Sequence, residues 1–487
     1  MPLSLNSEAL TKLPDGVEGP AYDRAALTPG ILHIGVGNFH RAHQAWYLHR
    51  LFNTGKGHDW ALIGAGIKHF DQAMRDRLEP QDWLSTVVQL DPEGLSAEVT
   101  GAMVDFLPVD PAAIVARLED PAIRIVSLTV TEGGYFLNAA GGFQGDHPDI
   151  RADAANPEAP QTVFGVLIKA LKARRDAGAA PFTVLSCDNL PENGHVARQA
   201  VLGLARESDP GLADWIEENV AFPCGMVDCI TPATTQRERD MVAEKFGIAD
   251  AAPVICEPFH QWVLEDRFPQ GRPALEEVGV EFVDDVVPYE LMKLRILNAG
   301  HAAIAYVGAL LGHHFVHDAM GDAEVRDFLL ALIRREAIPT LSPIPGVDYE
   351  AYLSKCAERF SNAAVGDTIP RLCLDGSNRQ PKFVLPTVRD ALAKALPVDG
   401  LGLEVALWCR YCAETADPAS GITLEDERAK QLQAAALAAK EDPAAFLALS
   451  DVFGDLAAAP RFVEAFSASL RRLWQDGVRE TVRVYAG

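Results

Sequence analysis

One segment of the sequence, VPYELMKLRILNAGHAAIAY at 287–306, carries polar groups suited to proton transfer within an otherwise apolar helical pattern. At about 100° per residue, Lys293, His301 and Asn298 fall at roughly 0°, 80° and 140°, on one side of a helix. Burying three such side chains is costly unless they have partners or a function. Burial and the positive end of a helix both disfavour an ammonium, so we expect the pKa of Lys293 to fall toward neutrality. The pattern therefore predicts a lysine general base with two hydrogen-bond donors beside it.

Tyr289 and Lys293 also show the Tyr-x-x-x-Lys spacing in which a tyrosine is the acid/base and a lysine lowers its pKa. That pair is typical of short-chain dehydrogenases, which are much shorter chains and carry it closer to their glycine motif. We find no suitably placed serine upstream, and we therefore favour Lys293 itself as the base.

A second segment, ILHIGVGNFHRAH at 31–43, has a Gly-x-Gly between a predicted strand and a predicted helix. Glycines there allow a sharp turn and a close approach of backbone to a pyrophosphate, and a helix N-terminus offers free N–H groups to the anion. A third glycine would fall at position 40, which is a histidine. The segment predicts a dinucleotide site with these contacts: Gly35, Gly37, Asn38, Phe39 and Arg41.

The next predicted strand, at 60–67, is followed by Lys68-His69-Phe70-Asp71. An acidic residue at this point accepts a hydrogen bond from the adenosine ribose 2′-hydroxyl and repels a 2′-phosphate. Asp71 fits that role, although an aspartate here also suits a helix N-terminus. Lys68 would tolerate a phosphate. We expect NAD as the cofactor in preference to NADP.

The fold must hold these residues in position, and the sequence predicts a fold of two domains. The first part alternates apolar strands with helices, which is typical of an α/β fold with a mostly parallel, Rossmann-like sheet. Helical patterns dominate after Pro288. We predict a dinucleotide-binding domain at 1–286 and a mainly α-helical substrate and catalytic domain at 287–487. The strands are predicted at 31–35, 60–67, 84–90, 123–130, 182–188 and 252–258, and the main helices at 41–55, 163–178 and 289–311.

The amino-acid composition disfavours several classes of binding partner. The 487 residues carry a formal charge of −25 and are 48 % hydrophobic, so the surface disfavours nucleic acid and anionic membranes. No apolar run approaches the ~20 residues that span a bilayer, and the N-terminus lacks a signal-peptide pattern. The eight cysteines are scattered, as expected of reduced thiols in the cytoplasm. Cys409-x-x-Cys412 lies in a pattern typical of a buried helix, and His40-x-x-His43 lacks further ligands, so we expect no metal.

Several motifs together resemble the polyol-specific long-chain dehydrogenases. They occur in order along the chain, and the resemblance extends over its whole length. The resemblance implies a metal-independent, NAD-dependent enzyme that moves hydride between C2 of a polyol and the nicotinamide, interconverting D-mannitol and D-fructose, with D-arabinitol and sorbitol as related substrates. It also suggests a monomer. The motifs are GVGNFHRAHQAWYL at 35–48, SLTVTEGGY at 127–135, SCDNLPENG at 186–194, MVDCITP at 226–232, CEPFHQWVLED at 256–266 and MKLRILNAGH at 292–301.

The resemblance also implies roles for individual residues. Lys293 matches the family's catalytic base, while Asn298, His301 and Asn189 match donors to the reacting oxygen. Glu132, in TEGGY, matches an acid linked to proton exchange with solvent. Three further positions resemble polyol-binding residues: Asp228, Arg371 and Arg379.

Two alternatives stay open. A sugar-acid oxidoreductase of the same superfamily, such as a fructuronate reductase, would share most motifs, although TEGGY and PKF at 381–383 are closer to the polyol enzymes. A catalytically silent nucleotide-binding regulator would keep the glycine turn alone. The joint presence of Lys293, Asn298 and His301 argues against that second alternative.

Overall fold

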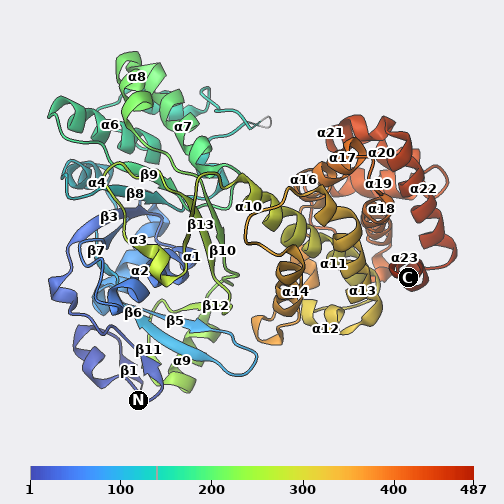
Figure 1. Cartoon of the computed structure of the whole chain (residues 1–487), viewed down its shortest axis with the longest axis horizontal. Coiled ribbons are helices and arrows are strands. Elements are labelled where there is room, and N and C mark those ends of the chain that lie inside the picture. Colours follow the sequence, from blue (N-terminus) through green and yellow to red (C-terminus); the bar gives the residue numbers. More distant parts are fainter. Residues whose placement is uncertain (1, 139–140) are drawn as a thin grey trace. The chain divides into compact units, whose positions relative to one another are not determined.

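The computed structural model describes residues 2–138 and 141–487. The chain divides into two compact units, Met1–Val287 and Pro288–Gly487. Strands gather in the first unit and helices make up the second (Figure 1). Two polypeptide cores are expected for a chain of this length.

The central sheet of the first unit has five parallel strands in the order β7-β4-β3-β8-β9. The chain begins at the centre with β3, moves outward to β7, and then crosses to β8 and β9 on the other side. This reversal creates a switch point between β3 and β8, and ligands of such sheets bind beyond the carboxyl ends of the strands at that point. The strands are β3 Pro29–Ile34, β4 Ala61–Ala65, β7 Met103–Phe106, β8 Ile125–Leu128 and β9 Thr183–Ser186.

Both faces of the central sheet are covered, which is why its strands are apolar throughout. Leu32 and Ile34 of β3 enter a core shared with α4, α6, α7 and α8, whereas Ile31 enters a core shared with α2 (Figure 1). The helices of this unit are α1 Asn38–Ala42, α2 Gln44–Asn53, α3 His69–Leu78, α4 Pro111–Leu118, α5 Pro148–Ala155, α6 Val163–Asp176, α7 Asn193–Ser208, α8 Pro210–Asn219 and α9 Gln236–Phe246.

Two strands that the sequence suggested for the parallel sheet lie elsewhere. β5 Ser85–Gln89 and β12 Val254–Cys256 belong to a four-stranded mixed sheet, β12-β5-β6-β2, in which β5 and β6 are antiparallel. Only residues 90–95 connect β5 to β6, and a parallel crossover needs a dozen residues or more. The remaining strands are β1 Leu3–Ser4, β2 Val17–Glu18, β6 Ser96–Thr100, β10 Gly225–Asp228, β11 Ile248–Ala249, β13 Gln261–Glu265 and β14 Glu281–Val283.

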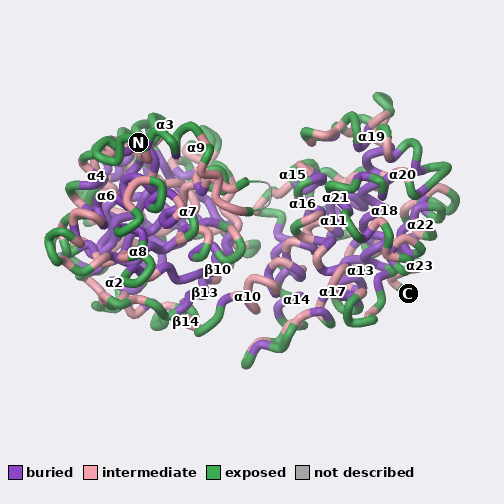
Figure 2. The backbone as a smooth tube through the Cα atoms, turned by 90° about the horizontal axis from the view of Figure 1, so that it is seen from above, coloured by how far each residue is buried: buried purple, intermediate pink, exposed green. Residues whose placement is uncertain are grey.

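The second unit, all of which is described, is helical apart from one bridge between Phe315 and Thr368. Helix α18, Asp399–Glu414, is buried over most of its length and packs against α11, α19 and α22 (Figure 2). A helix buried on nearly all sides forms the centre of a core. The other principal helices are α10 Val287–Met292, α11 Ala299–Leu310, α13 Ala323–Leu332, α14 Tyr349–Phe360, α15 Ile369–Cys373, α16 Gly376–Phe383, α17 Leu385–Ala393, α19 Ala429–Ala438, α22 Pro460–Gln475 and α23 Val478–Ala486.

The shorter helices of this unit are α12 Val316–Gly321, α20 Ala444–Leu447 and α21 Ser450–Phe453. Among residues 2–138 and 141–487, each helix is too short or too polar to cross a bilayer.

Candidate active site

The glycine turn follows β3 at the switch point of the sheet. Gly35 has φ +101°, and a Cβ built there would lie 2.1 Å from the carbonyl oxygen of Thr129. Only glycine fits that position. At Gly37 a Cβ would meet nothing closer than the Gly35 oxygen at 3.9 Å. The turn thus needs its first glycine for its own backbone, and it leaves open space at the second, as a cradle for a pyrophosphate requires.

The helix after this turn is shorter than the sequence indicated. Helix α1 ends at Ala42, and His43, with φ −118° and ψ −87°, separates it from α2. A helix of five residues has a weak macrodipole. The N–H groups of Gly35 and Gly37 already donate to the carbonyls of Ala65 and Gly35, so any attraction for an anion must come mainly from the N–H groups of the first residues of α1. His40 stands where a third glycine would allow close packing, and its ring stacks on His33 of β3 with the centroids 3.5 Å apart.

Burial keeps both of these histidines neutral. It lowers the pKa of His33 to about 3 and that of His40 well below its usual value. The His33 ring contacts the hydroxyls of Ser127 and Thr129, at 2.8 and 2.9 Å. The Thr129 hydroxyl in turn donates to the Gly35 carbonyl oxygen at 2.6 Å. The floor of the glycine turn is therefore a neutral hydrogen-bonded network between β3 and β8.

The structure gives Asn38 and Arg41 partners within the protein. The Asn38 amide donates to the Thr234 hydroxyl at 3.1 Å, and its oxygen accepts from Arg41 at 2.8 Å. Arg41 is buried, donates to the Ser85 hydroxyl at 2.8 Å and to the carbonyl of Ala252, and burial lowers its pKa to about 10. Phe39 is half-buried and stacks on His43. These contacts fix the position of the turn on the mixed sheet.

Asp71, at the carboxyl end of β4, caps α3. One of its oxygens accepts from the backbone N–H groups of Ile67 and Lys68, at 2.9 and 2.8 Å, and burial raises the pKa of its carboxyl. Both bonds use the same oxygen, Oδ2. The neighbouring Phe70 is 69 % exposed. The sequence allowed Asp71 as a helix N-cap. In the structure Lys68 is the N-cap, and Asp71 caps the helix from the third residue of α3 through Oδ2, which leaves Oδ1 for a further donor.

Loops after β8 and β9 carry Glu132 and Asn189, and a buried aspartate joins them. Both oxygens of Asp188 accept backbone N–H groups, from Val130 and Thr131, at 2.9 Å each. The hydroxyl of Tyr135 donates to the same carboxylate at 2.6 Å. Burial raises the pKa of Asp188, although these hydrogen bonds oppose the shift.

Thr131 has φ +65°, a strained conformation for a β-branched residue that is typical of functional loops. Sequence reasoning missed Asp188 and Tyr135, although SCDNLPENG and TEGGY contain them. Both Glu132 and Asn189 are exposed. The loops that Asp188 joins therefore carry two exposed polar side chains at the ends of neighbouring strands.

Asp228 ends β10 and is buried, with 5 % of its surface exposed. It pairs with Gln261 of β13 in an antiparallel register. Its carboxylate therefore comes from a small third sheet, the three-stranded β10-β13-β14, and not from the strands that carry the glycine turn.

In the second unit the helical run around Lys293 is not a straight α-helix. Residues Lys293–Asn298 form a π-helical segment between α10 and α11. Backbone hydrogen bonds in a π-helix join residues i and i+5, so a π-helical turn holds more residues than an α-helical turn. Lys293 and Asn298 are therefore closer in angle around the helix axis than the about 140° that an α-helix would put between them. His301 follows Asn298 by three residues, one α-helical turn.

The π-helical segment is anchored through its buried arginine. Arg295 donates to the Thr340 hydroxyl at 2.7 Å and forms an ion pair with Asp390. Lys293 is itself buried, with 8 % exposed, whereas Asn298 and His301 are half-buried. The ring of His301 lies 4.4 Å from that of Phe360. A π-helical turn within an α-helix frequently marks a functional site, and here it contains the predicted base.

Arg371 and Arg379, expected to bind a polyol, make contacts within the second unit. Arg371 donates through two nitrogens to the carboxylate of Asp367. Burial raises the pKa of Asp367, but Arg371 and, more weakly, His301 outweigh burial and hold it below its usual value. Arg379 donates to the backbone oxygens of residues 371 and 372, at 3.2 and 3.0 Å. Asp367 is thus ion-paired with Arg371 and lies within the electrostatic influence of His301.

Sequence spacing offered no set of metal ligands, but folding brings one together. Cys229, Cys256 and His260 place their sulfur and nitrogen atoms within 4.8 Å of one another. In the part of the chain that is described this is the one group of three or more such residues, and it includes neither His40 nor His43. Cys409 and Cys412 are buried and free, as their helical pattern indicated.

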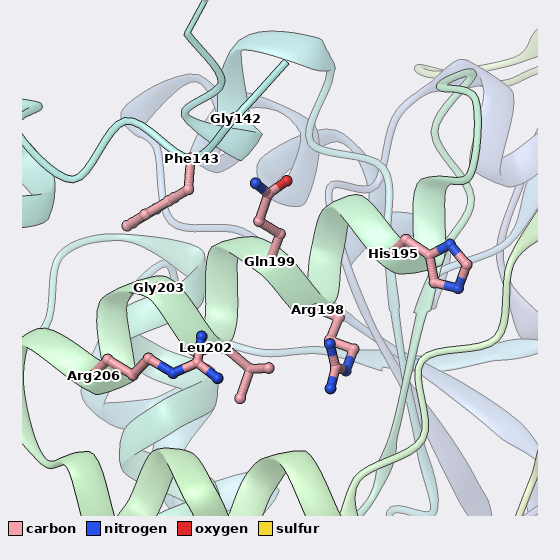
Figure 3. A pocket seen from close by; sticks show the side chains of 8 residues that line it. All are labelled: Gly142, Phe143, His195, Arg198, Gln199, Leu202, Gly203 and Arg206. Carbon is pink, nitrogen blue, oxygen red and sulfur yellow. The ribbon is translucent and has the colours of Figure 1, made fainter. Parts of the chain in front are cut away.

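A surface hollow of about 530 Å³ lies beside α7 (Figure 3). Its arginines, Arg198 and Arg206, both bind Glu217, at 2.5 and 2.8 Å. It contains none of the residues predicted to act on a cofactor or a substrate. Its two arginines share the single carboxylate of Glu217, and because it contains none of the predicted residues we do not assign the predicted chemistry to it.

Comparison with protein families gives two matches that together extend over most of the chain. The model described as the mannitol dehydrogenase Rossmann domain matches residues 29–277. The model described as the mannitol dehydrogenase C-terminal domain matches residues 285–474.

Individual proteins match over nearly their full length. The mannitol 2-dehydrogenase of Cereibacter sphaeroides is 55 % identical over 471 residues, 96 % of this chain and 98 % of that protein. The structure of Pseudomonas fluorescens mannitol 2-dehydrogenase in a ternary complex with NAD and D-mannitol has a TM-score of 0.85 at 42 % identity and covers 99 % of each chain. A substrate-free D-sorbitol dehydrogenase has a TM-score of 0.90 at 37 % identity, with 98 % and 100 % covered.

Proposed function

Because the chain belongs to the mannitol dehydrogenase family, we propose that it catalyses the NAD-dependent, reversible oxidation of D-mannitol to D-fructose. The full-length match to mannitol 2-dehydrogenases carries this proposal. The fold agrees with it, because a Rossmann-type sheet with a glycine turn at its switch point is suited to a dinucleotide. The open space at Gly37 fits the pyrophosphate of such a cofactor.

Lys293 is proposed as the general base that takes the proton of the C2 hydroxyl. Oxidation of a secondary alcohol removes that proton together with a hydride, and NAD when bound supplies the hydride acceptor. A buried amine with a lowered pKa suits proton removal near neutral pH, and Lys293 is 8 % exposed. In the reverse direction the Lys293 ammonium returns the proton to the ketose oxygen.

Asn298 and His301 are proposed to donate hydrogen bonds to the reacting oxygen. Negative charge develops on that oxygen as the proton leaves, and fixed donors stabilise it without reorganising. The π-helical turn supports this assignment because it brings Asn298 toward the line of Lys293. Asn189 is proposed as a further donor, and Glu132 as the group that exchanges the proton with solvent. Asp228, Arg371 and Arg379 are proposed to bind the outer hydroxyls of the polyol.

The cofactor-binding residues stay a proposal as well. We assign the pyrophosphate to the turn at Gly35, Gly37 and Asn38, with Phe39 and Arg41 shaping the site. Asp71 is proposed to accept from the ribose 2′-hydroxyl through its second oxygen, because its first is used by the backbone. This arrangement favours NAD over NADP.

The decisive experiment is a panel of polyols and ketoses assayed with both NAD(H) and NADP(H). We expect D-mannitol oxidation and D-fructose reduction to be fastest with NAD(H), with D-arabinitol and sorbitol as slower substrates. The similar D-sorbitol dehydrogenase makes sorbitol the second candidate to test. Strong fructuronate reduction without mannitol oxidation would overturn the assignment in favour of a sugar-acid reductase, and binding of NAD without any turnover would indicate a regulator.

A monomer in the cytoplasm is proposed for this enzyme. None of the eight cysteines, all of which lie in the described residues, forms a disulfide, and all are buried, which suits a reducing compartment. Sedimentation at several protein concentrations should give the mass of one chain. Thiol titration of the denatured protein, purified without reductant, should give eight thiols per chain; a mass that rises with concentration, or fewer thiols, would contradict the respective assignment.

A further inference from the structure

Three potential metal ligands meet beside the small third sheet. β10 and β13 are antiparallel, and their last register pair is Asp228 with Gln261. Cys229 and His260 are the next residues outward on the two strands, so the ladder itself places them opposite each other. Cys256 ends β12, and the chain then returns through Pro258 to His260. The backbone N–H of Glu257 donates to the carbonyl of Ile230 at 3.0 Å and closes this loop.

The three ligand atoms are near the spacing that a metal requires. A tetrahedral zinc with Zn–S about 2.3 Å and Zn–N about 2.0 Å would hold sulfur and nitrogen about 3.5 Å apart. Here the Cys256 sulfur is 3.9 Å from Nε2 of His260, and the sulfur of Cys229 lies within 4.8 Å of both atoms. The distances between the three ligand atoms would have to shorten by between a few tenths of an ångström and about 1 Å to match those around a bound zinc.

Contacts around the cluster orient its ligands. The ring of His260 stacks on Trp46, with the centroids 3.9 Å apart and the planes 15° from parallel. Nδ1 of His260 lies 3.2 Å from the carbonyl oxygen of Pro258, which is the backbone contact that commonly fixes the tautomer of a metal-bound histidine. The Thr231 hydroxyl lies 3.8 Å from the Cys229 sulfur and would stabilise a thiolate. Two cysteines and one histidine form a donor set that zinc prefers.

We propose that Cys229, Cys256 and His260 bind one thiophilic divalent cation, of the zinc class, at a site that takes no part in the hydride transfer. Binding of the cation replaces the thiol protons and one hydrogen-bond contact of His260. Each coordinating thiol releases a proton, and His260 coordinates through Nε2, which now lies 3.0 Å from the carbonyl oxygen of Ala42. Because the thiols must lose their protons to coordinate, the affinity for the cation should increase with pH.

The proposed cation site is connected to the glycine turn through helix α1. Ala42 is the last residue of α1, which begins directly after Gly37, and its carbonyl would lose the His260 contact when the cation binds. Asp228, proposed to bind substrate, precedes Cys229 in the chain. The cation would therefore act as a modulator of this region.

The test uses the full-length wild-type protein, reduced and freed of metal, and titrates it with Co²⁺ and then with Zn²⁺. We expect one Co²⁺ per chain with intense thiolate-to-metal charge-transfer absorption, and displacement by one Zn²⁺. A wild-type titration without that absorption overturns the proposal, and it needs no variant that folds. This readout is independent of polyol oxidation, so its failure leaves the enzymatic assignment untouched.

Variants locate the site. Cys229→Ser, Cys256→Ser and His260→Gln should each weaken Co²⁺ binding at least about 100-fold, and the two cysteine variants should also reduce the charge-transfer intensity. Cys409→Ser, which removes a buried thiol of the second unit, is the matched control and should bind like the wild type. Loss of binding in the control, or retention in all three cluster variants, would place the cation elsewhere and refute the assignment.

Discussion

The glycine turn after β3 and the π-helical turn at Lys293–Asn298 present reactive groups by opposite means. The first removes side chains: Gly35 avoids the Thr129 carbonyl, and Gly37 leaves space for a ligand to approach the backbone. The second adds backbone, since a π-helical turn contains more residues than an α-helical turn and thereby reduces the angle around the helix axis between side chains five positions apart. A cofactor can be held by peptide groups, whereas proton transfer needs side chains in a fixed relation.

Two buried titratable groups, one in each unit, have pKa values shifted in opposite directions. Below the glycine turn, burial lowers the pKa of His33 to about 3. In the second unit, burial raises the pKa of Glu404, on α18, to about 8. The histidine favours folding above its unfolded pKa of about 6.5, and this contribution is lost as the pH falls toward 3. For Glu404 the sign is reversed, so these two groups limit stability at opposite ends of the pH range.

The largest effect should come from Lys293→Ala, which removes the proposed base but leaves the π-helical turn. We expect polyol oxidation to fall by about 10²–10⁴, as for loss of a general base, with NADH binding unchanged. Lys430→Ala, an exposed lysine of α19, is the control. In the wild type the rate should rise with pH as Lys293 loses its proton. A rate that stays flat from about pH 6 to about pH 10 would contradict a lowered lysine pKa.

The glycine turn should separate folding from cofactor binding. In Gly35→Ala the new Cβ would meet the Thr129 carbonyl at 2.1 Å, and φ would be +101°, so we expect a loss of several kcal/mol in stability, above the ~1–3 kcal/mol of backbone strain alone. Gly37→Ala has space and a permitted φ of −97°. It should keep the melting temperature and weaken NADH binding about 10-fold or more. Equal NADH affinity in Gly37→Ala would move the pyrophosphate away from this turn.

Sequence reasoning identified what local patterns encode. Hydrophobic periodicity predicted three features: the strand before the glycine turn, the apolar strands with both faces covered, and the change to a helical second part. The family followed from motifs that are specific only in combination.

The features that sequence reasoning missed depend on contacts distant in sequence. β5 and β12 pair in the mixed sheet across about 170 residues. The π-helical turn looks like α-helix in its periodicity, because its anchor, Arg295 with Thr340 and Asp390, comes from other helices. Asp188 was hidden because its role, joining the loops after β8 and β9, exists only once those strands are parallel neighbours.

Glu404→Gln tests the basic side of the pH comparison. In the wild type the stability linked to Glu404 is fully present below its unfolded value of 4.5 and is lost as the pH rises through about 8. The variant should abolish that loss and be more stable by a few kcal/mol above about pH 8, with little change at low pH. Its amide oxygen can still accept from Gln380, which donates to Glu404 at 2.7 Å. Unfolding free energies measured across pH check this, with Glu414→Gln as control. Parallel curves for wild type and variant would show that Glu404 does not titrate in this range.

The smallest expected effect concerns cofactor choice at Asp71, where one carboxylate has two proposed tasks. Oδ2 caps α3 through Ile67 and Lys68, and Oδ1 is proposed to accept from the ribose. Asp71→Asn keeps an oxygen for one task and loses the charge that repels a 2′-phosphate, so the preference for NAD over NADP should shrink about 10-fold, or ~1.4 kcal/mol. Asp76→Asn, further along the exposed face of α3, is the control. If stability falls while the NAD/NADP ratio of kcat/KM stays constant, Asp71 only caps α3 and does not select the cofactor. Backbone groups of the glycine turn would then be the remaining proposed contacts to the cofactor.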